Sequence, residues 1–491
     1  MVKLRWYWLV AIFGAIGLMA SLVMISLPKT SVFVLVLVAP FAAIILPLIW
    51  TEFIRSSRVL LRSLRWYHWL WFLIFLSGLT FRIRDAQQIQ SSLVDPAALF
   101  RIALEFVTFL VLAWRLALRK TDWVRSLFRG LIALLAIYAL MSLASTVWSA
   151  FPPWTAFKSL EYLLDVMLLA AVVASVESLE SYQDFMDWTW TLYTLALLSV
   201  WIGVVVSPEL ALHPITGVFG VQLKGVWPDI AADSVGEFGA VVSTIAFARL
   251  VLRPGNLHNR LWYSLAFLIG CANMLMAQAR TAIAGFGMAV MLVLILSRRW
   301  ALAAFLTFTG TLVTLPLVIS GWLWQYLQRG QTEDQLSSLS SRVEWWRFAW
   351  EKFSQQPLIG YGAYAAGRFV VMAGLQMGKT SSTHSDWVEI LVGTGLWGLI
   401  PAILSLLGTC WVLASLFRNP VGEPLERELT IEALALILLV FVRSFFNVNC
   451  FWHPPLIFFA VLGYAEFMRR RRTLRHELPA DAEFADLAMN P

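Results

Sequence analysis

The sequence has little charge and almost no cysteine. Only 14% of its 491 residues are charged and 59% are apolar, whereas soluble proteins carry about 25% charged residues. So little charge cannot cover the surface of a soluble chain of this length, which excludes a conventional soluble enzyme and a disordered chain. Three cysteines without paired spacing exclude a disulfide scaffold and a paired-cysteine zinc site. The composition is that of a polytopic membrane protein, whose outer surface faces lipid.

The sequence also lacks the motifs of soluble enzymes. It has no phosphate loop, no dinucleotide fingerprint, no His-Glu-x-x-His zinc motif and no Asp-x-Asp cluster. We therefore expect chemistry that requires neither a bound metal nor a cofactor.

Long apolar runs are abundant, and each one of about 17–25 residues can cross a bilayer as a helix. They predict an all-α polytopic membrane protein with about 12–14 transmembrane helices. The candidate spans lie near 6–27, 32–50, 66–81, 99–118, 130–148, 159–176, 188–207, 233–252, 261–279, 281–297, 300–320, 386–416, 430–447 and 455–467.

The arginines choose the orientation of these spans. An even number of spans puts both termini on one side, and the positive-inside rule makes that side the cytoplasm. The predicted inside segments hold clusters at Arg55–Arg65, Arg119–Arg129, Arg253–Arg260, Arg298–Arg299 and Arg469–Arg475. Because the basic residues are spread over separate loops, the net charge of +7 does not indicate a nucleic-acid partner.

Two outer segments are exceptionally long, and long structured loops in compact proteins are usually functional. They define our division of the chain. Residues 1–207 form N-terminal helices, 208–467 form a region with outer loops at 208–232 and 321–384, and 468–491 form a cytoplasmic tail.

The longer loop contains local structure of its own. Ser341 and Glu344 have capping-box spacing and predict an amphipathic, Trp-rich helix that ends before Pro357 and lies at the membrane surface. Its apolar face is expected to hold Val343, Trp346, Trp350 and Phe353. A tight glycine turn follows at 357–362. The capping spacing from Thr383 to Asp386 predicts that His384 lies in the first turn of the next span.

Four outer residues are candidates for chemistry, because ionisable groups at membrane depth are costly. Arg280, Lys224 and Arg342 could bind an anion, and a neutral His384 at a helix N-terminus could act as a general base. Each also has a structural interpretation. Arg280 could reach the interface from a helix end, Lys224 and Arg342 could be solvated, and a lone histidine is more often structural.

Two further groups of charged residues have a structural interpretation. Arg101, Glu105 and Arg115 share one span and are expected to pair within the bundle. Weaker candidates for a functional site lie near the last two spans, at Arg443, Asn447 and His453.

The order of motifs between about 210 and 420 resembles the O-antigen ligase and O-antigen polymerase superfamily. The resemblance rests on Gln-Ala-Arg280-Thr, then Ser-Ser-Arg342 with Trp345 and Trp346, Pro357-Leu-Ile-Gly360-Tyr-Gly, and Thr-His384-Ser-Asp-Trp. The family pattern has Ser-Arg-Gly where this chain has Ala-Arg280-Thr, and often His-Asn where it has His384-Ser385. The N-terminal half matches only in being helical.

The resemblance implies a fold similar to C-type glycosyltransferases and a site on the periplasmic face of the bacterial inner membrane. Such enzymes take a glycan from undecaprenyl pyrophosphate in the membrane lipid and transfer it, without metal, to lipid A-core or to another lipid-linked glycan. The resemblance also implies that His384 and Arg280 are catalytic and that Arg280, Lys224 and Arg342 bind the pyrophosphate. Inversion at the anomeric carbon is expected by analogy.

Two other classes remain open from the sequence. A lipid-linked oligosaccharide flippase or another transporter should contain inverted repeats and charges around a midplane cavity, and the sequence has no evident repeat. A non-catalytic scaffold would lose its rationale if the outer cations converged on His384. The same motifs serve both ligases and polymerases, so the acceptor stays open.

Overall fold

The computed structural model describes residues 63–80, 84, 86–92, 94–118, 122–215, 219–253, 257–328, 331, 341–377, 382–420 and 422–477. The first two candidate spans, near 6–27 and 32–50, and the tail from 478 onward lie outside these residues.

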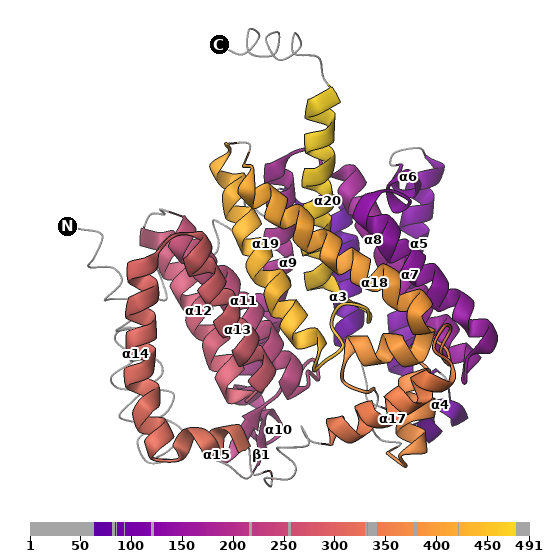
Figure 1. Ribbon diagram of the computed structural model, residues 1–491, viewed down its shortest axis with the longest axis horizontal. Coiled ribbons are helices and arrows are strands. Elements are labelled where there is room, and N and C mark those ends of the chain that lie inside the picture. Colours follow the sequence, from indigo (N-terminus) through magenta and orange to yellow (C-terminus); the bar gives the residue numbers. More distant parts are fainter. Residues whose placement is uncertain are drawn as a thin grey trace.

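The described chain is a bundle of helices, as the apolar runs predict (Figure 1). Helices occur at all of the other candidate spans. Their bounds are α3 Trp66–Leu79, α5 Pro96–Ala117, α7 Gly130–Ala144, α8 Pro152–Ser175, α9 Leu179–Val206, α11 Ala232–Leu252, α12 Leu257–Met276, α13 Arg280–Leu296, α14 Trp300–Ile319, α18 Asp386–Arg418, α19 Pro424–Ser444 and α20 Leu456–Glu477.

Six helices in the described part are long and apolar enough to cross a membrane. They are α5, α7 with its 3₁₀ extension η2 (Ser145–Trp148), α9, α11, α14 and α18. Helices α3 and α13 are shorter, and α8 carries Lys158, Glu161 and Asp165 along its buried face. The chain is therefore an all-α polytopic membrane protein, as the sequence predicts.

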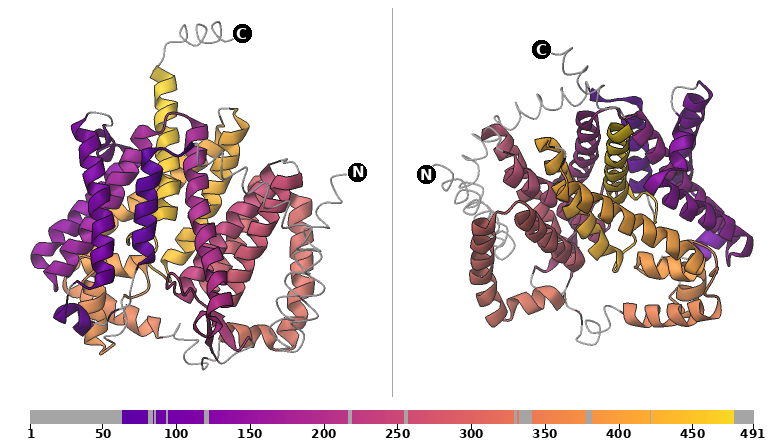
Figure 2. Two further views of the ribbon diagram at one scale, coloured as in Figure 1. Left: turned by 180° about the vertical axis from the view of Figure 1, so that it is seen from behind. Right: turned by 45° about the horizontal axis from the view of Figure 1, so that its top comes forward.

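The centre and the edge of the bundle differ in burial. Helix α20 lies at the centre against α7, α8, α9, α18 and α19, and its residues from Leu456 to Met468 are buried. Helix α14 stands at the edge in both views of Figure 2, and only 6% of its apolar window is buried. An apolar helix with so little protein around it suits a lipid environment.

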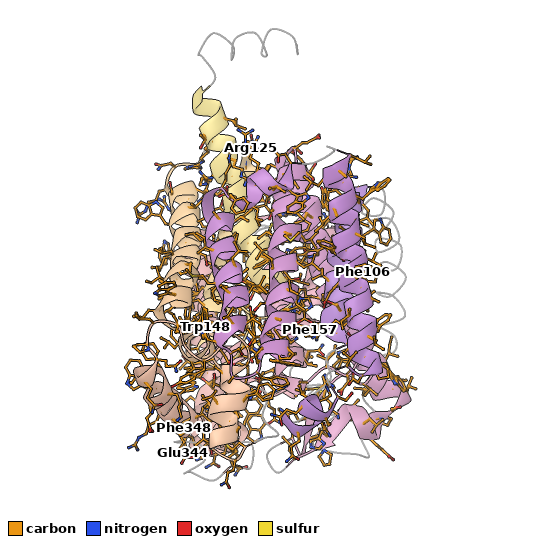
Figure 3. All side chains as sticks on the ribbon, turned by 90° about the vertical axis from the view of Figure 1, so that its right-hand side faces the viewer. Phe106, Arg125, Trp148, Phe157, Glu344 and Phe348 are labelled. Atoms are coloured by element: carbon orange, nitrogen blue, oxygen red, sulfur yellow. The ribbon has the colours of Figure 1, made fainter. Side chains whose placement is uncertain are left out.

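Most of the short elements gather at one end of the bundle, which we call the loop end, whereas α6 Trp123–Leu127 lies at the other (Figure 1). The elements at the loop end are α4 Ala86–Ser91, α10 Pro208–Ala211, the hairpin of β1 Leu212–Pro214 and β2 Val221–Leu223, α15 Trp322–Gln328 and α17 Arg342–Gln355. Figure 3 shows Arg125 at the opposite end from Glu344 and Phe348 of α17. The two predicted long loops thus lie together, away from Arg125, whose loop is predicted to be inside.

The predicted amphipathic helix exists as α17, but two details of the prediction are wrong. Ser341 is left-handed (φ 67°) and makes no capping hydrogen bond. The buried face is Trp345, Ala349 and Phe353, whereas Trp350, which we expected to share a face with Phe353, is 60% exposed. The buried face packs on α18 and on a π-helical segment, η3 Ala366–Met372. Packing against α18 and η3 thus decides which face of α17 is covered.

Helix α18 is broken within its first third, in the run that the sequence indicates as one span at 386–416. Gly395 has φ 62° and ψ −155°, a conformation open essentially only to glycine. The turn at 357–362 docks on this break. The N–H of Leu396 donates to the Pro357 carbonyl at 2.9 Å, and the N–H of Tyr361 donates to the Val392 carbonyl at 2.8 Å. The long loop is therefore bonded into the membrane helix through its backbone.

Candidate functional site

His384 lies just before α18 rather than in its first turn, which corrects the prediction. Its backbone is left-handed (φ 55°), and the extended Ser385 is the N-cap, so the helix begins at Asp386. Thr383 and Asp386, which have the capping spacing, form hydrogen bonds with other residues instead. The Thr383 N–H donates to Glu389, and the Asp386 carboxylate accepts hydrogen bonds from the loop after α19. His384 is thereby held outside the helix, with its ring beside α17.

The His384 ring is held neutral by its surroundings. It lies 5.9 Å from the Trp345 ring, centroid to centroid, and its Nδ1 has no hydrogen-bond partner among the described residues. Burial, followed by the positive charge of Arg342, lowers the pKa of His384 to about 4, and Asp233 partly opposes them. The sequence attributed a neutral ring to the helix dipole, whereas the structure attributes it to burial and a neighbouring cation.

Arg342 begins α17, on the same side of the bundle as His384. Its Nη1 donates to the Phe446 carbonyl at 2.9 Å, at the start of the loop that joins α19 to α20. The neighbouring Trp346 donates through Nε1 to the Thr383 carbonyl at 3.0 Å. Arg342 and His384 are therefore brought together by bonds from α17 to both flanking segments.

Arg280 is the first residue of α13, after the very short connection that the sequence predicts. Its guanidinium donates to the Leu327 carbonyl and to the Gln331 side chain, each at 2.9 Å. The residues before it are also anchored, because Gln222 of β2 donates to the Ala277 carbonyl at 2.8 Å. The first outer loop, the start of α13 and the start of the long loop thus meet at Arg280.

Lys224 follows β2 and is half-buried. Its backbone N–H donates to the Ala211 carbonyl at 2.9 Å, which closes the hairpin near the end of α10. No bond from the Lys224 side chain to Arg280, Arg342 or His384 is found in the described part. Lys224 shares the loop end with these residues, and the strand before it is joined to the segment before Arg280 through the bond from Gln222 to Ala277.

A buried charged pair lies behind Arg280. The sequence patterns did not predict it as part of the site. Arg443, at the end of α19, donates to Glu237 of α11 at 2.9 Å and to the hydroxyl of Thr281 at 3.2 Å. Arg443 is fully buried, and Thr281 is the residue after Arg280. The signal was available, because both Arg443 and Glu237 are charged residues within apolar runs.

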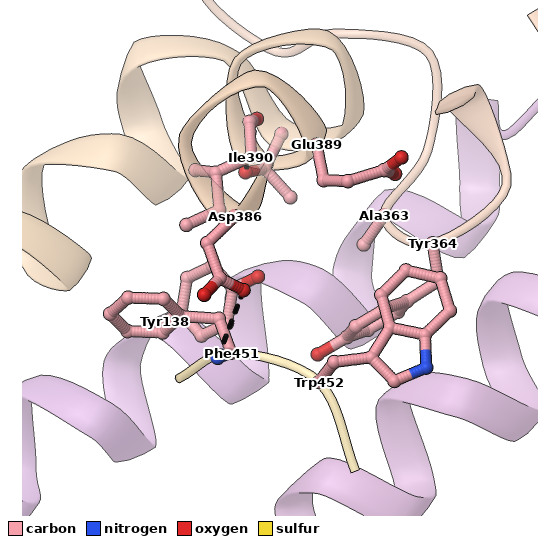
Figure 4. A pocket seen from close by; sticks show the side chains of 9 residues that line it. Tyr138, Ala363, Tyr364, Asp386, Glu389, Ile390, Phe451 and Trp452 are labelled. Carbon is pink, nitrogen blue, oxygen red and sulfur yellow. Dashed lines mark hydrogen bonds between the residues drawn. The ribbon is translucent and has the colours of Figure 1, made fainter. Parts of the chain in front are cut away.

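Two carboxylates near the start of α18, those of Asp386 and Glu389, line a small cavity (Figure 4). Asp386 accepts from the N–H groups of Asn449 and Cys450, each at 2.9 Å. The cavity has a volume of about 10 Å³ and is also lined by Glu389, Tyr138 and Tyr364. That is room for about one water molecule. We therefore interpret Asp386 as an anchor for the loop after α19, which also receives Arg342.

Arg101 and Glu105 of α5 form ion pairs within the bundle, as the sequence indicates, whereas Arg115 of the same helix lies 4.2 Å from the centre of the Trp66 ring. Arg101 forms an ion pair with Glu161, whose second oxygen is 2.6 Å from Lys158. His453 lies 2.8 Å from Asp165 and 3.4 Å from Glu105. Glu105, Glu161 and His453 come close enough to hold a metal ion, but the two cations already engage Glu161. The arrangement therefore fits an ion-pair network better than a metal site.

A family model described as O-antigen ligase matches residues 265–403 of the chain. The matched segment contains Arg280, Arg342 and His384 and lies within the region that carries the resemblance. The resemblance to the O-antigen ligase and polymerase superfamily is therefore confirmed, and it supports a membrane function of that type. No protein with a curated description matches the chain.

Proposed function

We propose that this protein is a membrane glycosyltransferase of the O-antigen ligase or polymerase type. It would transfer a glycan from undecaprenyl pyrophosphate to a sugar hydroxyl at the periplasmic face of the inner membrane. The observation that carries the proposal is the family match over residues 265–403, together with the proximity of two of its polar residues, Arg342 and His384.

The donor would be held by the outer cations. Negative charge grows on the pyrophosphate as it leaves, and guanidinium groups stabilise it through paired, charge-assisted hydrogen bonds. Arg280 is our first choice for this role, with Lys224 and Arg342 as helpers. Arg280 spans the junction of the outer loops, where a lipid-linked group could arrive from the bilayer.

The acceptor would be activated by His384. The hydroxyl oxygen of the acceptor forms a bond to the anomeric carbon while the bond from that carbon to the phosphate oxygen breaks. The hydroxyl proton passes to the neutral imidazole, and the lipid pyrophosphate leaves with the bonding electron pair. A single displacement of this kind inverts the anomeric carbon. The low pKa of His384, about 4, keeps the ring able to accept a proton at neutral pH.

Variants of the site residues test the mechanism. We expect His384→Ala and Arg280→Ala each to abolish glycan transfer while the protein still accumulates in the membrane. The exposed His213 and Arg347 offer matched controls, and His213→Ala and Arg347→Ala should transfer normally. Transfer at the wild-type rate by His384→Ala or Arg280→Ala would remove that residue from the mechanism.

A deletion strain distinguishes the two members of the superfamily. If the protein is a ligase, full-length polymer should accumulate on the lipid carrier and be missing from the surface acceptor. If it is a polymerase, the surface acceptor should carry a single repeat. Unchanged surface polysaccharide in the deletion strain would contradict both forms of the proposal.

A further inference from the structure

A second pocket lies at the loop end, separate from Arg280 and His384. It is built from the starts of α5 and α8, the residues between α3 and α5, and η3. Its polar and aromatic lining consists of Arg84, Asp95, Arg101, Trp154, Phe157 and Arg368. These residues come from three segments that are distant in the sequence, at 80–101, 154–157 and 368, so the pocket exists only in the folded protein.

The guanidinium groups of Arg84, Arg101 and Arg368 line this pocket, and those of Arg84 and Arg101 are held in place by hydrogen bonds or ion pairs. Arg84 lies 3.6 Å from Asp95 and donates to the Ser92 carbonyl at 2.7 Å. Arg101 is fixed from below by its ion pair with Glu161. Planar guanidinium groups with fixed positions suit paired hydrogen bonds to a carboxylate or a phosphate.

Aromatic rings complete the wall. The Arg368 guanidinium lies 5.0 Å from the centre of the Trp154 ring, and the Arg101 guanidinium lies 5.3 Å from the centre of the Phe157 ring. Trp154 is fixed by a hydrogen bond from its Nε1 to the Tyr364 carbonyl at 3.2 Å. Phe157 is half-buried and lines the pocket.

This combination of groups suits one class of ligand. Aromatic faces pack against the C–H faces of sugar rings, and a few fixed polar groups bind the hydroxyls and set the orientation. Among the lining residues, three arginines and one aspartate favour a sugar that also carries an acidic group, although Glu161 pairs with Arg101 from outside the lining. The cavity of about 30 Å³ holds about two water molecules, so it would accept the acidic group while the ring rests on Phe157.

One structural link joins the pocket to His384. The Glu389 carboxylate packs against Gly367, the residue before Arg368. The same carboxylate accepts the N–H of Thr383, next to His384. The η3 segment and Glu389 therefore form the wall between the pocket and the histidine.

We propose that this pocket binds an acidic sugar residue and that this residue belongs to the glycan acceptor. The assignment to the acceptor rests on the proposed function, whereas the binding itself does not. A sugar seated here would anchor the acceptor on one side of η3 while another of its residues presents a hydroxyl to His384.

Calorimetry with the full-length protein in lipid nanodiscs tests the binding. The probes are glucose 6-phosphate, glucose and inorganic phosphate. Glucose 6-phosphate should bind more tightly than either of the other two. Arg84→Gln and Phe157→Leu should each weaken its binding by about tenfold, close to 1.4 kcal/mol. Arg347→Gln, at an exposed site on α17, should bind as wild type does.

Several results would overturn the assignment. They are the absence of glucose 6-phosphate binding at millimolar concentration, equal binding by Arg84→Gln and wild type, and phosphate binding as tight as that of glucose 6-phosphate. His384→Ala should retain the binding, so loss of the transfer function and loss of the pocket are told apart. In a transfer assay, Arg84→Gln should raise the KM for the acceptor and leave the KM for the donor unchanged. A rise in the donor KM alone would contradict the acceptor role.

Discussion

At the scale of single residues, the protonation state of His384 decides what the candidate site can do. A buried ring beside a guanidinium stays neutral without help from a partner carboxylate. Such a base is weak but permanently available near neutral pH. The same Arg342 that keeps it neutral is also a candidate ligand for the departing pyrophosphate, so one cation would serve both halves of the reaction.

The pH dependence of transfer follows from this environment. Because the pKa of His384 is lowered to about 4, the base is already unprotonated over the whole range from about pH 5.5 to 7.5. We expect kcat/KM to be flat with respect to this group over that range and to fall only as the pH approaches 4. A loss of activity with its midpoint near 6.5, the ordinary histidine value, would contradict the environment described for His384.

The pair of Arg443 and Glu237 gives a second prediction at this scale. Arg443→Gln leaves Glu237 buried without its partner, so we expect a loss of about 3–5 kcal/mol in stability. Glu237→Gln combined with Arg443→Gln should cost less than the sum of the single changes. Thermal unfolding in detergent measures both effects.

A surface pair provides the comparison for Arg443. Arg471 and Glu423 lie 2.8 Å apart with side chains 27% and 37% exposed, and Arg471→Gln should cost about 0–1 kcal/mol. Equal losses for Arg443→Gln and Arg471→Gln would show that burial of the Arg443 pair has no energetic consequence.

At the scale of elements, the break in α18 shapes the site. The turn at 357–362 fits into the break only because the helix has no side chain there. A Cβ on Gly395 would lie 2.5 Å from the Leu358 carbonyl group. The break therefore fixes both η3 and the start of α18 relative to α17. His384, Arg342 and the second pocket all depend on this docking.

Gly395→Ala tests the role of the break. The change places a side chain in a backbone conformation that only glycine adopts readily, and it should cost about 1–3 kcal/mol. Gly310→Ala in α14 is the matched control, because a Cβ there has nothing within 4 Å, and it should leave the melting temperature nearly unchanged. An unchanged melting temperature for Gly395→Ala would mean that the helix is continuous in solution.

The connection between α19 and α20 is the second organising element. Its Phe446 carbonyl accepts a hydrogen bond from Arg342. Its backbone N–H groups donate to Asp386, and its His453 ring is hydrogen-bonded to Asp165. One loop thus ties the candidate site to the buried ion-pair network of α5 and α8. That network, which pairs charges from distant helices, holds the loop from below.

At the scale of the whole molecule, the polar groups with a proposed function lie at one end of the bundle axis. Helix α17, which begins at Arg342, and helix α4, which contributes Ile89 to the second pocket, lie at the loop end, and the arginine-rich end of α20 lies at the other (Figure 1). Apolar side chains cover the lipid-facing edge, as in α14. This separation fits an enzyme that works on one membrane face, whereas an alternating-access carrier would need a polar site near the midplane.

The proposed orientation is tested by two exposed positions at opposite ends. Ser354 of α17 and Thr473 of α20 are both exposed and accept a cysteine with little structural cost. In intact spheroplasts, a membrane-impermeant maleimide should label Ser354→Cys and not Thr473→Cys, and lysis should make both reactive. Labelling of Thr473→Cys before lysis would invert the proposed topology.

The sequence alone predicted the class of the protein and most of its helices. A bilayer forces every backbone polar group to be satisfied within the chain, so a long apolar run is a helix whatever its neighbours are. The O-antigen ligase resemblance could also be found from the sequence, because its motifs are short and local. The roles of Arg280, Lys224, Arg342 and His384 stay predictions.

Only the tertiary structure decided which charged residues meet. Local spacing placed His384 inside a helix and Ser341 as a cap. Contacts with α17 and with the loop after α19 determine the conformations of both residues instead, because a cap hydrogen bond stabilises a helix by only about 1 kcal/mol. The pairing of Arg443 with Glu237, the break at Gly395 and the pocket around Trp154 join residues far apart in the chain. No local pattern encodes such partners, since they depend on how the helices pack.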